Sequence, residues 1–165
     1  MSYIEVTYPE RGAKFYQMLR EQLELYTRGE PDLTAVLANA SSVIAQAFPK
    51  ANWVGFYLVD KNELKLGPFQ GRPAVMRIGY GCGVCGSAWK RKKSIVVDEV
   101  ECFEGHIACD CNTHSEIVVP LWEGGEIWGV LDMDSVLPAH FTEEDRIGLE
   151  GCVDLLSRPK RPGAL

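Results

Sequence analysis

The sequence predicts an α+β fold, in which one mostly antiparallel sheet carries N- and C-terminal helices on one face. Two observations support this class. Apolar residues recur at helical spacing near both ends of the chain, whereas the middle consists of short apolar or alternating runs separated by turn residues. Helices gathered at the termini around hairpins are typical of an α+β sandwich. We therefore expect a single domain over residues 1–165, with a frayed tail at about 157–165.

Helices are predicted near both ends of the chain. Residues 15–26, "FYQMLREQLELY", place apolar side chains three and four positions apart, and residues 32–48, "DLTAVLANASSVIAQAF", repeat this spacing. Residues 142–156 form a third helical segment, which opens with Thr142 as an N-cap and an acidic first turn. These patterns predict two amphipathic helices before the sheet and one after it.

Six short runs with strand character lie between these helices. The runs are 53–60 and 63–70 in a first hairpin, 115–122 and 126–135 in a second hairpin, and 74–78 and 94–98 as single strands. The glycine-rich stretch "GCGVCGSAWKRKK" (81–93) is expected to turn into a short helix. Its basic end, "KRKK", suits the C-terminal end of a helix dipole, and an interaction patch is the alternative.

Composition and charge disfavour several classes of protein. The net charge of −6 disfavours nucleic acid as a partner, because neutralising phosphates requires a surplus of Lys and Arg. No run approaches the roughly 18 apolar residues that a membrane span needs. The N-terminus lacks a basic stretch followed by an apolar block, so a secretory signal is not expected. A cytoplasmic location away from membranes is the expectation.

Cysteines are the first group of candidate functional residues. Thiols stay reduced in the cytoplasm, so the six cysteines favour redox chemistry or metal binding over structural disulfides. Cys82 and Cys85 form a C-x-x-C pair, and Cys109 and Cys111 form a C-x-C pair with histidines nearby. These groups could supply four tetrahedral zinc ligands, but the chain is large enough to fold without a metal. Spacing alone leaves metal binding, redox chemistry and inert burial open.

Carboxylates are the second group of candidates, namely Glu116, Asp132 and Asp134. Because side chains alternate along a strand, Asp132 and Asp134 are expected on one face with Met133 on the other. Such a polar face is unusual in a central strand. In the alternative interpretation, "DMDS" begins the following loop and its carboxylates are solvated.

Aromatic residues form the third group. Trp53 and Tyr57 share one face of their predicted strand with the small Gly55 between them, while Val54 and Phe56 face the other way. This pattern predicts a hollow walled by rings. The simpler alternative is that both rings fill the core.

The motifs that carry these candidates resemble those of a known family. Between about Trp53 and Glu144 they are, in order, "WVGFYLV", "GPFQGRPA", "GVCGSA", "GHIACD", "SEIVVPL" and "GVLDMDS". This set is similar to the signatures of the free methionine-(R)-sulfoxide reductases, which are enzymes built on a GAF domain. A GAF domain that only senses small molecules is not expected to carry both the "GVCG" and the "GHIACD" cysteines.

The resemblance implies an activity and a thiol mechanism. The activity is reduction of free L-methionine-(R)-sulfoxide to L-methionine, with thioredoxin or another dithiol as reductant and with no cofactor or metal. Cys109 would attack the sulfoxide and become a sulfenic acid, because a thiolate is the side chain that attacks sulfoxide sulfur readily. A second thiol would convert this sulfenic acid to a disulfide that exchanges with thioredoxin.

The resemblance also implies which groups hold the substrate. Glu116, Asp132 and Asp134 would bind the substrate amine and help to protonate the sulfoxide oxygen. Trp53 and Tyr57 would wall the methyl and thioether end. The substrate carboxylate would meet backbone N–H groups near Ile107 and Ala108. Neither His106 nor His114 is expected to be a metal ligand or an essential base.

The sequence departs from the family pattern at the resolving thiol. The family usually has a cysteine within "AC-x-RI", but this chain reads "AVMRI" and carries Val75 there. We therefore favour Cys85 as resolving thiol, with Cys82 in reserve and direct action of external thiols as a further alternative. Cys111 is too near Cys109 for an easy bridge. The reverse assignment of Cys109 and Cys85 stays open.

Two rival functions remain at this point. A GAF binding module would hold a ligand in the same hollow without turnover. A zinc-binding protein would hold one metal through Cys82, Cys85, Cys109 and Cys111 and would lose stability under chelation. A homodimer through the terminal helices is compatible with the resemblance.

Overall fold

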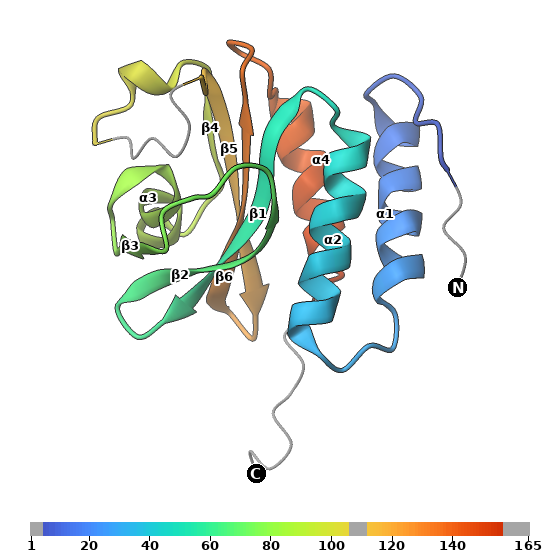
Figure 1. Ribbon diagram of the computed structural model, residues 1–165, viewed down its shortest axis with the longest axis horizontal. Helices are drawn as coiled ribbons and strands as arrows, with labels where there is room; N and C mark the ends of the chain where they lie inside the picture. The colour runs from blue at the N-terminus through green and yellow to red at the C-terminus, as the bar shows by residue number, and fades with distance from the viewer. Residues whose placement is uncertain (1–4, 106–111, 157–165) are drawn as a thin grey trace.

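A six-stranded sheet forms the centre of the computed structural model, which describes residues 5–105 and 112–156 (Figure 1). Every neighbouring pair of strands is antiparallel, and the order across the sheet is β3-β2-β1-β6-β5-β4. The strands are β1 (Ala51–Asp60), β2 (Glu63–Gln70), β3 (Arg77–Gly79), β4 (Ile95–Val97), β5 (Ser115–Glu123) and β6 (Glu126–Ser135). The predicted α+β class with an antiparallel sheet is confirmed. The expected frayed tail at 157–165 lies outside the described residues.

The terminal helices lie on one side of this sheet, as the sequence predicts (Figure 1). They are α1 (Ala13–Thr27), α2 (Leu33–Ala47) and α4 (Glu143–Val153). Helices α2 and α4 pack on the strands, and α1 packs against α2 and α4. The short helix α3 (Gly83–Arg91) lies on the other side, and a 3-10 turn spans Val100–Cys102. Within the described ranges no helix is both long enough and apolar enough to cross a bilayer.

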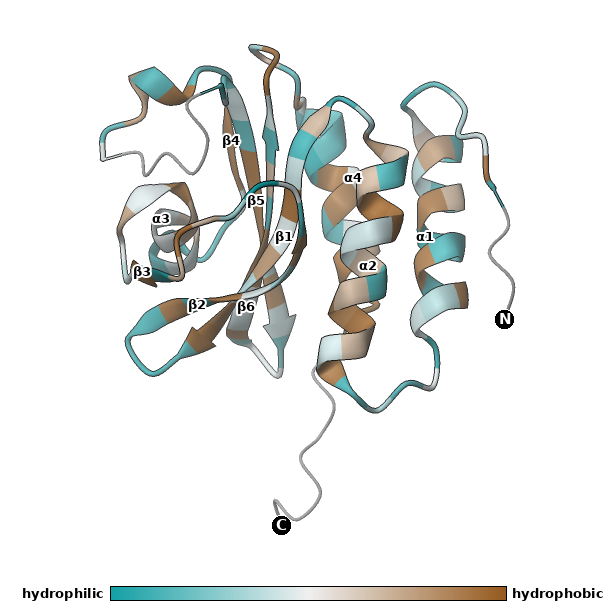
Figure 2. Cartoon of the chain, viewed as in Figure 1, coloured by the Kyte–Doolittle hydropathy of each residue, from teal (hydrophilic) through white to brown (hydrophobic). Residues whose placement is uncertain are grey.

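Alternation along the strands divides the core into two layers. Val54, Phe56 and Met133 belong to one cluster with apolar side chains of α1, α2 and α4. Figure 2 shows hydrophobic residues recurring along these three helices. Trp53 and Tyr57 point to the opposite face and pack in a second cluster with side chains of α3. The smaller second layer is the one that receives the "GVCG" cysteine.

The third strand differs from its prediction. It covers Arg77–Gly79 rather than 74–78, and it pairs with β2 over only three residues. Met76 precedes it as an exposed residue, although its carbonyl oxygen accepts a hydrogen bond from Leu66 N–H at 3.0 Å. An edge strand this short has few pairing partners, so the apolar run in the sequence does not fix its limits.

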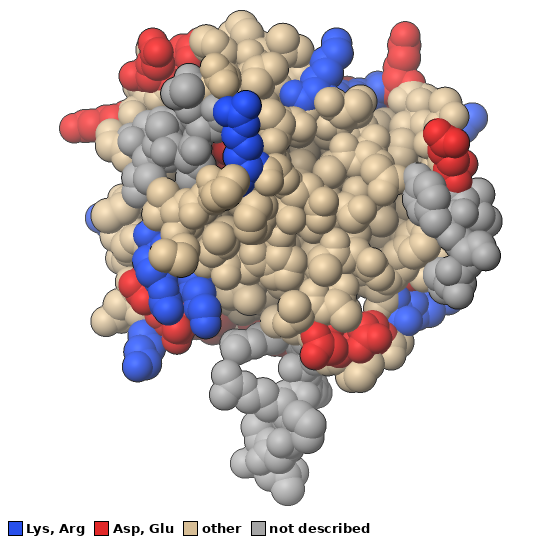
Figure 3. All heavy atoms as spheres, in the orientation of Figure 1, with Lys and Arg blue, Asp and Glu red and all other residues tan. Residues whose placement is uncertain are grey.

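Charges of both signs are scattered over the face shown in Figure 3. The predicted basic end of α3 is confirmed, with Lys90 and Arg91 in the last turn and Lys92 as the left-handed C-cap. These cations lie where the helix dipole favours positive charge.

One buried carboxylate ties α4 to the N-terminal region. Asp145, which has no exposed surface, completes a capping box with Thr142 and accepts a hydrogen bond from Arg11 Nη1 at 2.7 Å. The Tyr16 hydroxyl of α1 donates to its other oxygen. Burial raises the pKa of the Tyr16 hydroxyl, and its hydrogen bond to Asp145 adds to this shift. Asp145 therefore joins a helix start to two distant segments.

Replacement of Asp145 is expected to destabilise the protein strongly. Asp145→Ala removes the cap and leaves the Tyr16 hydroxyl without its acceptor, so the free energy of unfolding is expected to fall by about 3 kcal/mol. Glu143→Gln is the matched control, because Glu143 is an acid of the same first turn that is 68% exposed in its pair with Arg146. Glu143→Gln is expected to lower the free energy of unfolding by less than about 1 kcal/mol. Urea unfolding measures both, and equal losses would contradict this account.

Candidate active site

Three acids meet on the α3 side of the sheet. In the register of β5 and β6, Glu116 lies opposite Asp134, and Asp132 lies two residues before Asp134 in β6. Met133 points into the opposite core layer, as alternation predicts. All three acids are buried, with 5% or 6% of their surface exposed. The alternative in which "DMDS" begins a solvated loop is wrong, because β6 continues to Ser135.

Helix α3 brings Cys85 to these acids. Its first turn is held by a glycine-rich loop, in which Cys82 N–H donates to Gly79 O at 3.0 Å and Gly86 N–H donates to Cys82 O at 2.9 Å. A Cβ atom at Gly86 would overlap the Gly79 carbonyl oxygen, so only glycine permits this close approach. Cys85 is consequently buried, whereas Cys82 at the helix N-cap is exposed.

Cys85, Glu116 and Asp132 form a tight cluster. The sulfur of Cys85 and one carboxylate oxygen from each acid all lie within 4.8 Å of one another. A cavity of about 20 Å³ adjoins them. Its lining consists of Ile78, Gly83, Val84, Cys85, Glu116, Asp132 and Asp134. This volume suits one water molecule or one ammonium group.

Burial and mutual repulsion perturb the ionisation of the cluster. Desolvation raises the pKa of Glu116 well above its usual value, and the charge of Asp134 raises it further. Desolvation likewise raises the pKa of Asp132, and the charge of Glu116 raises it further. The hydrogen bond between these two acids raises the pKa of Asp132 further and lowers that of Glu116.

The thiol of Cys85 is also kept protonated by its surroundings. Burial raises its pKa well above the usual cysteine value, and the nearby charges of Asp132 and Glu116 raise it further. A thiol in this environment is a weak nucleophile until a base removes its proton. Asp132 is hydrogen-bonded to it and lies in position to exchange that proton.

The aromatic residues are placed on the predicted face, but they do not leave a hollow between them. The Trp53 ring stacks on Tyr57 at 5.9 Å and on Phe69 at 5.2 Å between ring centroids. It lies over Gly55, where a Cβ atom would be 2.5 Å from the ring. Trp53 faces Asp134 across the β1 and β6 pairing. Both rings are buried, and neither lines the small cavity beside Cys85.

Several predicted site residues lie outside the described residues. These are His106, Ile107, Ala108, Cys109 and Cys111. His114 is described and is 48% exposed, with its Nδ1 atom 3.4 Å from Glu99 Oε1. It is not among the residues that line the cavity.

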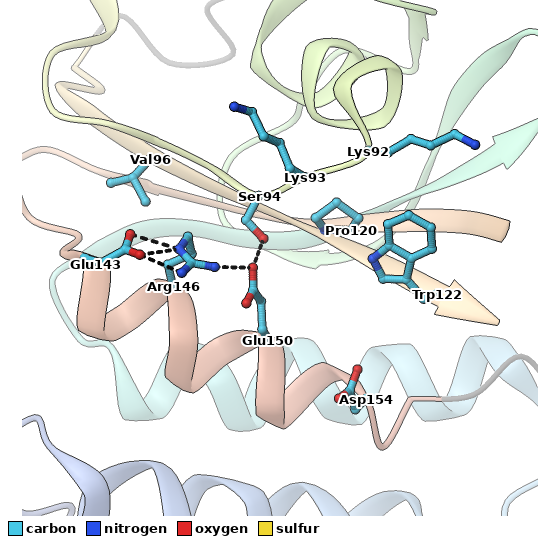
Figure 4. Close-up of a pocket in the computed structure, with 10 residues that line it drawn as sticks. All are labelled: Lys92, Lys93, Ser94, Val96, Pro120, Trp122, Glu143, Arg146, Glu150 and Asp154. Carbon is cyan, nitrogen blue, oxygen red and sulfur yellow. Dashed lines mark hydrogen bonds and ion pairs between the residues drawn. The ribbon is translucent and has the colours of Figure 1, made fainter. Parts of the chain in front are cut away.

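A larger groove lies elsewhere on the protein, between α4 and the strands β4 and β5 (Figure 4). It encloses about 680 Å³ beside the exposed Trp122. Arg146 bridges Glu143 and Glu150 across its floor, and Ser94 donates to Glu150 at 2.6 Å. Size alone does not make it the reactive site, because Glu143 and Glu150 are engaged with Arg146 and Ser94 and none of the described residues that line it is a cysteine.

The chain is similar to known proteins in both sequence and structure. The GAF domain family matches residues 32–158. The chain is 43% identical to the free methionine-R-sulfoxide reductase of Escherichia coli (strain K12), over 88% of each chain. It is 40% identical to the protein of the same name from Saccharomyces cerevisiae, over 79% of this chain and 77% of that one. The chain belongs to the free methionine-R-sulfoxide reductase family.

A solved structure from this family matches the fold closely. It is the free methionine-R-sulfoxide reductase from Neisseria meningitidis in complex with its substrate, with a TM-score of 0.88, 41% identity and coverage of 94% of each chain. The resemblance inferred from the motifs is thus confirmed. Because these relatives are named as reductases, the expectation of an enzyme is confirmed at the level of the family.

Some lining residues of the cavity escape sequence reasoning. Ile78 and Val84 form apolar walls next to Cys85 and the acids. Val84 lies within the quoted "GVCG" motif, so its proximity to Cys85 was a usable signal. Ile78 comes from the short edge strand β3, and its sequence neighbours carry no chemical signal that assigns it to the site.

Proposed function

We propose that this protein reduces free methionine-(R)-sulfoxide to methionine by thiol chemistry. The observation that carries the proposal is the cluster of one buried thiol and three buried acids beside a small cavity. The named reductases among its relatives support the substrate, since the Neisseria meningitidis protein is described with its substrate bound. Cysteine chemistry needs no cofactor, and we propose none.

The acids supply the site for the substrate amine. None of the described residues that line the cavity is basic, so the negative charge of ionised carboxylates there favours a bound cation. The cavity of about 20 Å³ holds an ammonium group but not a whole amino acid. The sulfoxide end of the substrate would therefore extend beyond this cavity, with Trp53 next to Asp134 and stacked on Tyr57. We propose these two rings as the wall for the methyl and thioether end.

The proposed thiol steps use Cys109 and Cys85, and the position of Cys85 beside the acids supports the part given to it. Cys109 is proposed to attack the sulfoxide sulfur, taking up the oxygen as a sulfenic acid while methionine leaves. Asp132, whose pKa is raised well above its usual value by burial, is proposed to protonate the sulfoxide oxygen as its bond to sulfur breaks. Cys85 then attacks the sulfenic acid, which forms a disulfide and releases water.

Environment favours Cys85 as the resolving thiol rather than the attacking one. Its raised pKa disfavours the thiolate that the first step needs. A dithiol such as thioredoxin would reduce the disulfide by exchange and would itself become the disulfide. The substrate carboxylate is proposed to meet the backbone near Ile107 and Ala108, outside the described residues.

Neutralising Asp134 is expected to lower turnover strongly. Asp134→Asn keeps the shape of the side chain but removes its charge beside Glu116, so kcat/KM is expected to fall about a hundredfold. Asp60→Asn is the matched control, since Asp60 has a side chain that is 47% exposed and lies near Arg77 at the far end of β1. Steady-state kinetics with free methionine sulfoxide measures both variants. A near-native rate for Asp134→Asn would remove this carboxylate from the mechanism.

Thiol counting tests the proposed chemistry against a binding module. Reduced protein is mixed with an excess of free methionine-(R)-sulfoxide without added reductant, and methionine and remaining thiols are measured. We expect about one methionine per chain and the loss of two thiols for each methionine, because a disulfide forms in a single turnover. A GAF module that only binds its ligand would release no methionine and lose no thiol.

A further inference from the structure

The cluster beside α3 combines donors that differ from those of the four-cysteine zinc site considered from the sequence. One thiol and two carboxylates converge, and Asp134 lines the same cavity. Cys82, the other member of the C-x-x-C pair, is exposed at the helix N-cap and does not line this cavity. The geometry therefore groups Cys85 with acids.

One buried oxygen atom of this cluster lacks a hydrogen-bond partner among the described residues. This atom is Oδ1 of Asp132. Asp132 as a whole is 5% exposed, and it lines the cavity. A buried carboxylate oxygen without a partner costs free energy, and a cation in the cavity would offset that cost.

Distances and size suit a small metal ion. The ligand atoms of a tetrahedral zinc site lie about 3.3–3.8 Å apart, given bonds of about 2.0–2.3 Å. The three donor atoms are already within 4.8 Å of one another, so shifts of about 1 Å bring them to that spacing. The cavity of about 20 Å³ accommodates one ion. The presence of sulfur selects thiophilic metals such as zinc or cobalt over magnesium and calcium.

We infer that reduced protein binds one thiophilic divalent cation through Cys85, Glu116 and Asp132, with Asp134 at the fourth position. Binding displaces the thiol proton, because the thiolate is the form that binds a metal. The bound cation occupies the place of the substrate ammonium and blocks the Cys85 sulfur. Competition between the metal and the substrate rests on the proposed function. Binding of the metal itself does not depend on that function.

Cobalt binding tests the site without an activity assay. Reduced protein is titrated with Co²⁺, and the sulfur-to-cobalt charge-transfer band reports how many thiolates bind. We expect one Co²⁺ per chain with a band of single-thiolate intensity, displaced by Zn²⁺ but not by Mg²⁺. Cys85→Ser is expected to abolish the band, and Asp132→Asn to weaken binding at least about a hundredfold. Cys102→Ser is the control and is expected to bind as the wild type does.

Other outcomes would overturn the inference. Loss of the band in Cys82→Ser, with a wild-type intensity of several thiolates, would show the four-cysteine site instead. Unchanged Co²⁺ affinity in Asp132→Asn, with native circular dichroism, would show that the metal does not bind at this cluster. Absence of Co²⁺ binding to the wild type would also overturn the inference.

The outcome for the inference is distinct from that for the proposed function. If Co²⁺ binds as expected but no methionine forms from the sulfoxide, the metal site stands and the reductase proposal fails. If methionine forms and Co²⁺ does not bind, the reductase proposal stands alone. If both hold, Zn²⁺ is expected to raise the apparent KM with little change in kcat.

Discussion

Cys109→Ser is expected to release no methionine in a single turnover, whereas Cys85→Ser is expected to release about one equivalent and then stall. The reason is that methionine forms when the attacking thiol takes up the sulfoxide oxygen, whereas the resolving thiol acts only afterwards. In Cys85→Ser the sulfenic acid persists, because its proposed partner is missing. A dimedone-type reagent, followed by mass spectrometry, is expected to label Cys109 in that variant.

Controls and opposite results define this test. Cys102→Ser alters an exposed thiol outside the cluster and is expected to behave as the wild type. If the burst of methionine survives in Cys109→Ser and vanishes in Cys85→Ser, the two roles are reversed. If Cys85→Ser releases one equivalent and Cys82 then disappears from the thiol count, the exposed cysteine resolves the intermediate.

Methionine sulfoxide within a peptide is expected to be reduced about a thousandfold more slowly than the free amino acid. The acid cluster suits an ammonium group, and a peptide nitrogen supplies no charge to balance it. Leaving charge buried and unpaired costs several kcal/mol, which corresponds to roughly a thousandfold in kcat/KM. Rates on free methionine sulfoxide and on a mid-chain residue of a short peptide measure the difference.

Two small analogues separate the amine from the carboxylate. N-acetylmethionine sulfoxide removes the positive charge and is expected to share the full loss seen with the peptide. Methioninamide sulfoxide keeps the ammonium group and is expected to retain much more activity. Comparable rates on the N-acetyl compound and the free amino acid would contradict the role proposed for Glu116, Asp132 and Asp134.

Local periodicity accounts for what the sequence predicts well. The helical spacing in α1 and α2 and the alternation around Met133 are properties of neighbouring residues, and both appear in the structure. The limits of β3 were wrong because a three-residue edge strand is fixed by its partner rather than by its own sequence. The sequence also did not predict that Arg11 and Tyr16 meet Asp145, because those contacts join residues about 130 positions apart.

The site was predicted in its parts more than in its geometry. Alternation placed Asp132 and Asp134 on one face, and the register of β5 and β6 places Glu116 opposite Asp134. That Cys85 lies against these acids depends on the packing of α3 through Gly86, which no local pattern reveals. The hollow expected over Gly55 is absent from the described structure because the Trp53 ring itself fills that space.

Turnover of the two epimers of free methionine sulfoxide is the most direct test of the reductase proposal. Purified protein is supplied with dithiothreitol and either the R or the S epimer, and methionine is quantified by chromatography. The account predicts repeated turnover of the R epimer to methionine, the S epimer remaining unreduced as the family resemblance implies. Absence of methionine from the R epimer, with the protein folded and its thiols reduced, would contradict the account.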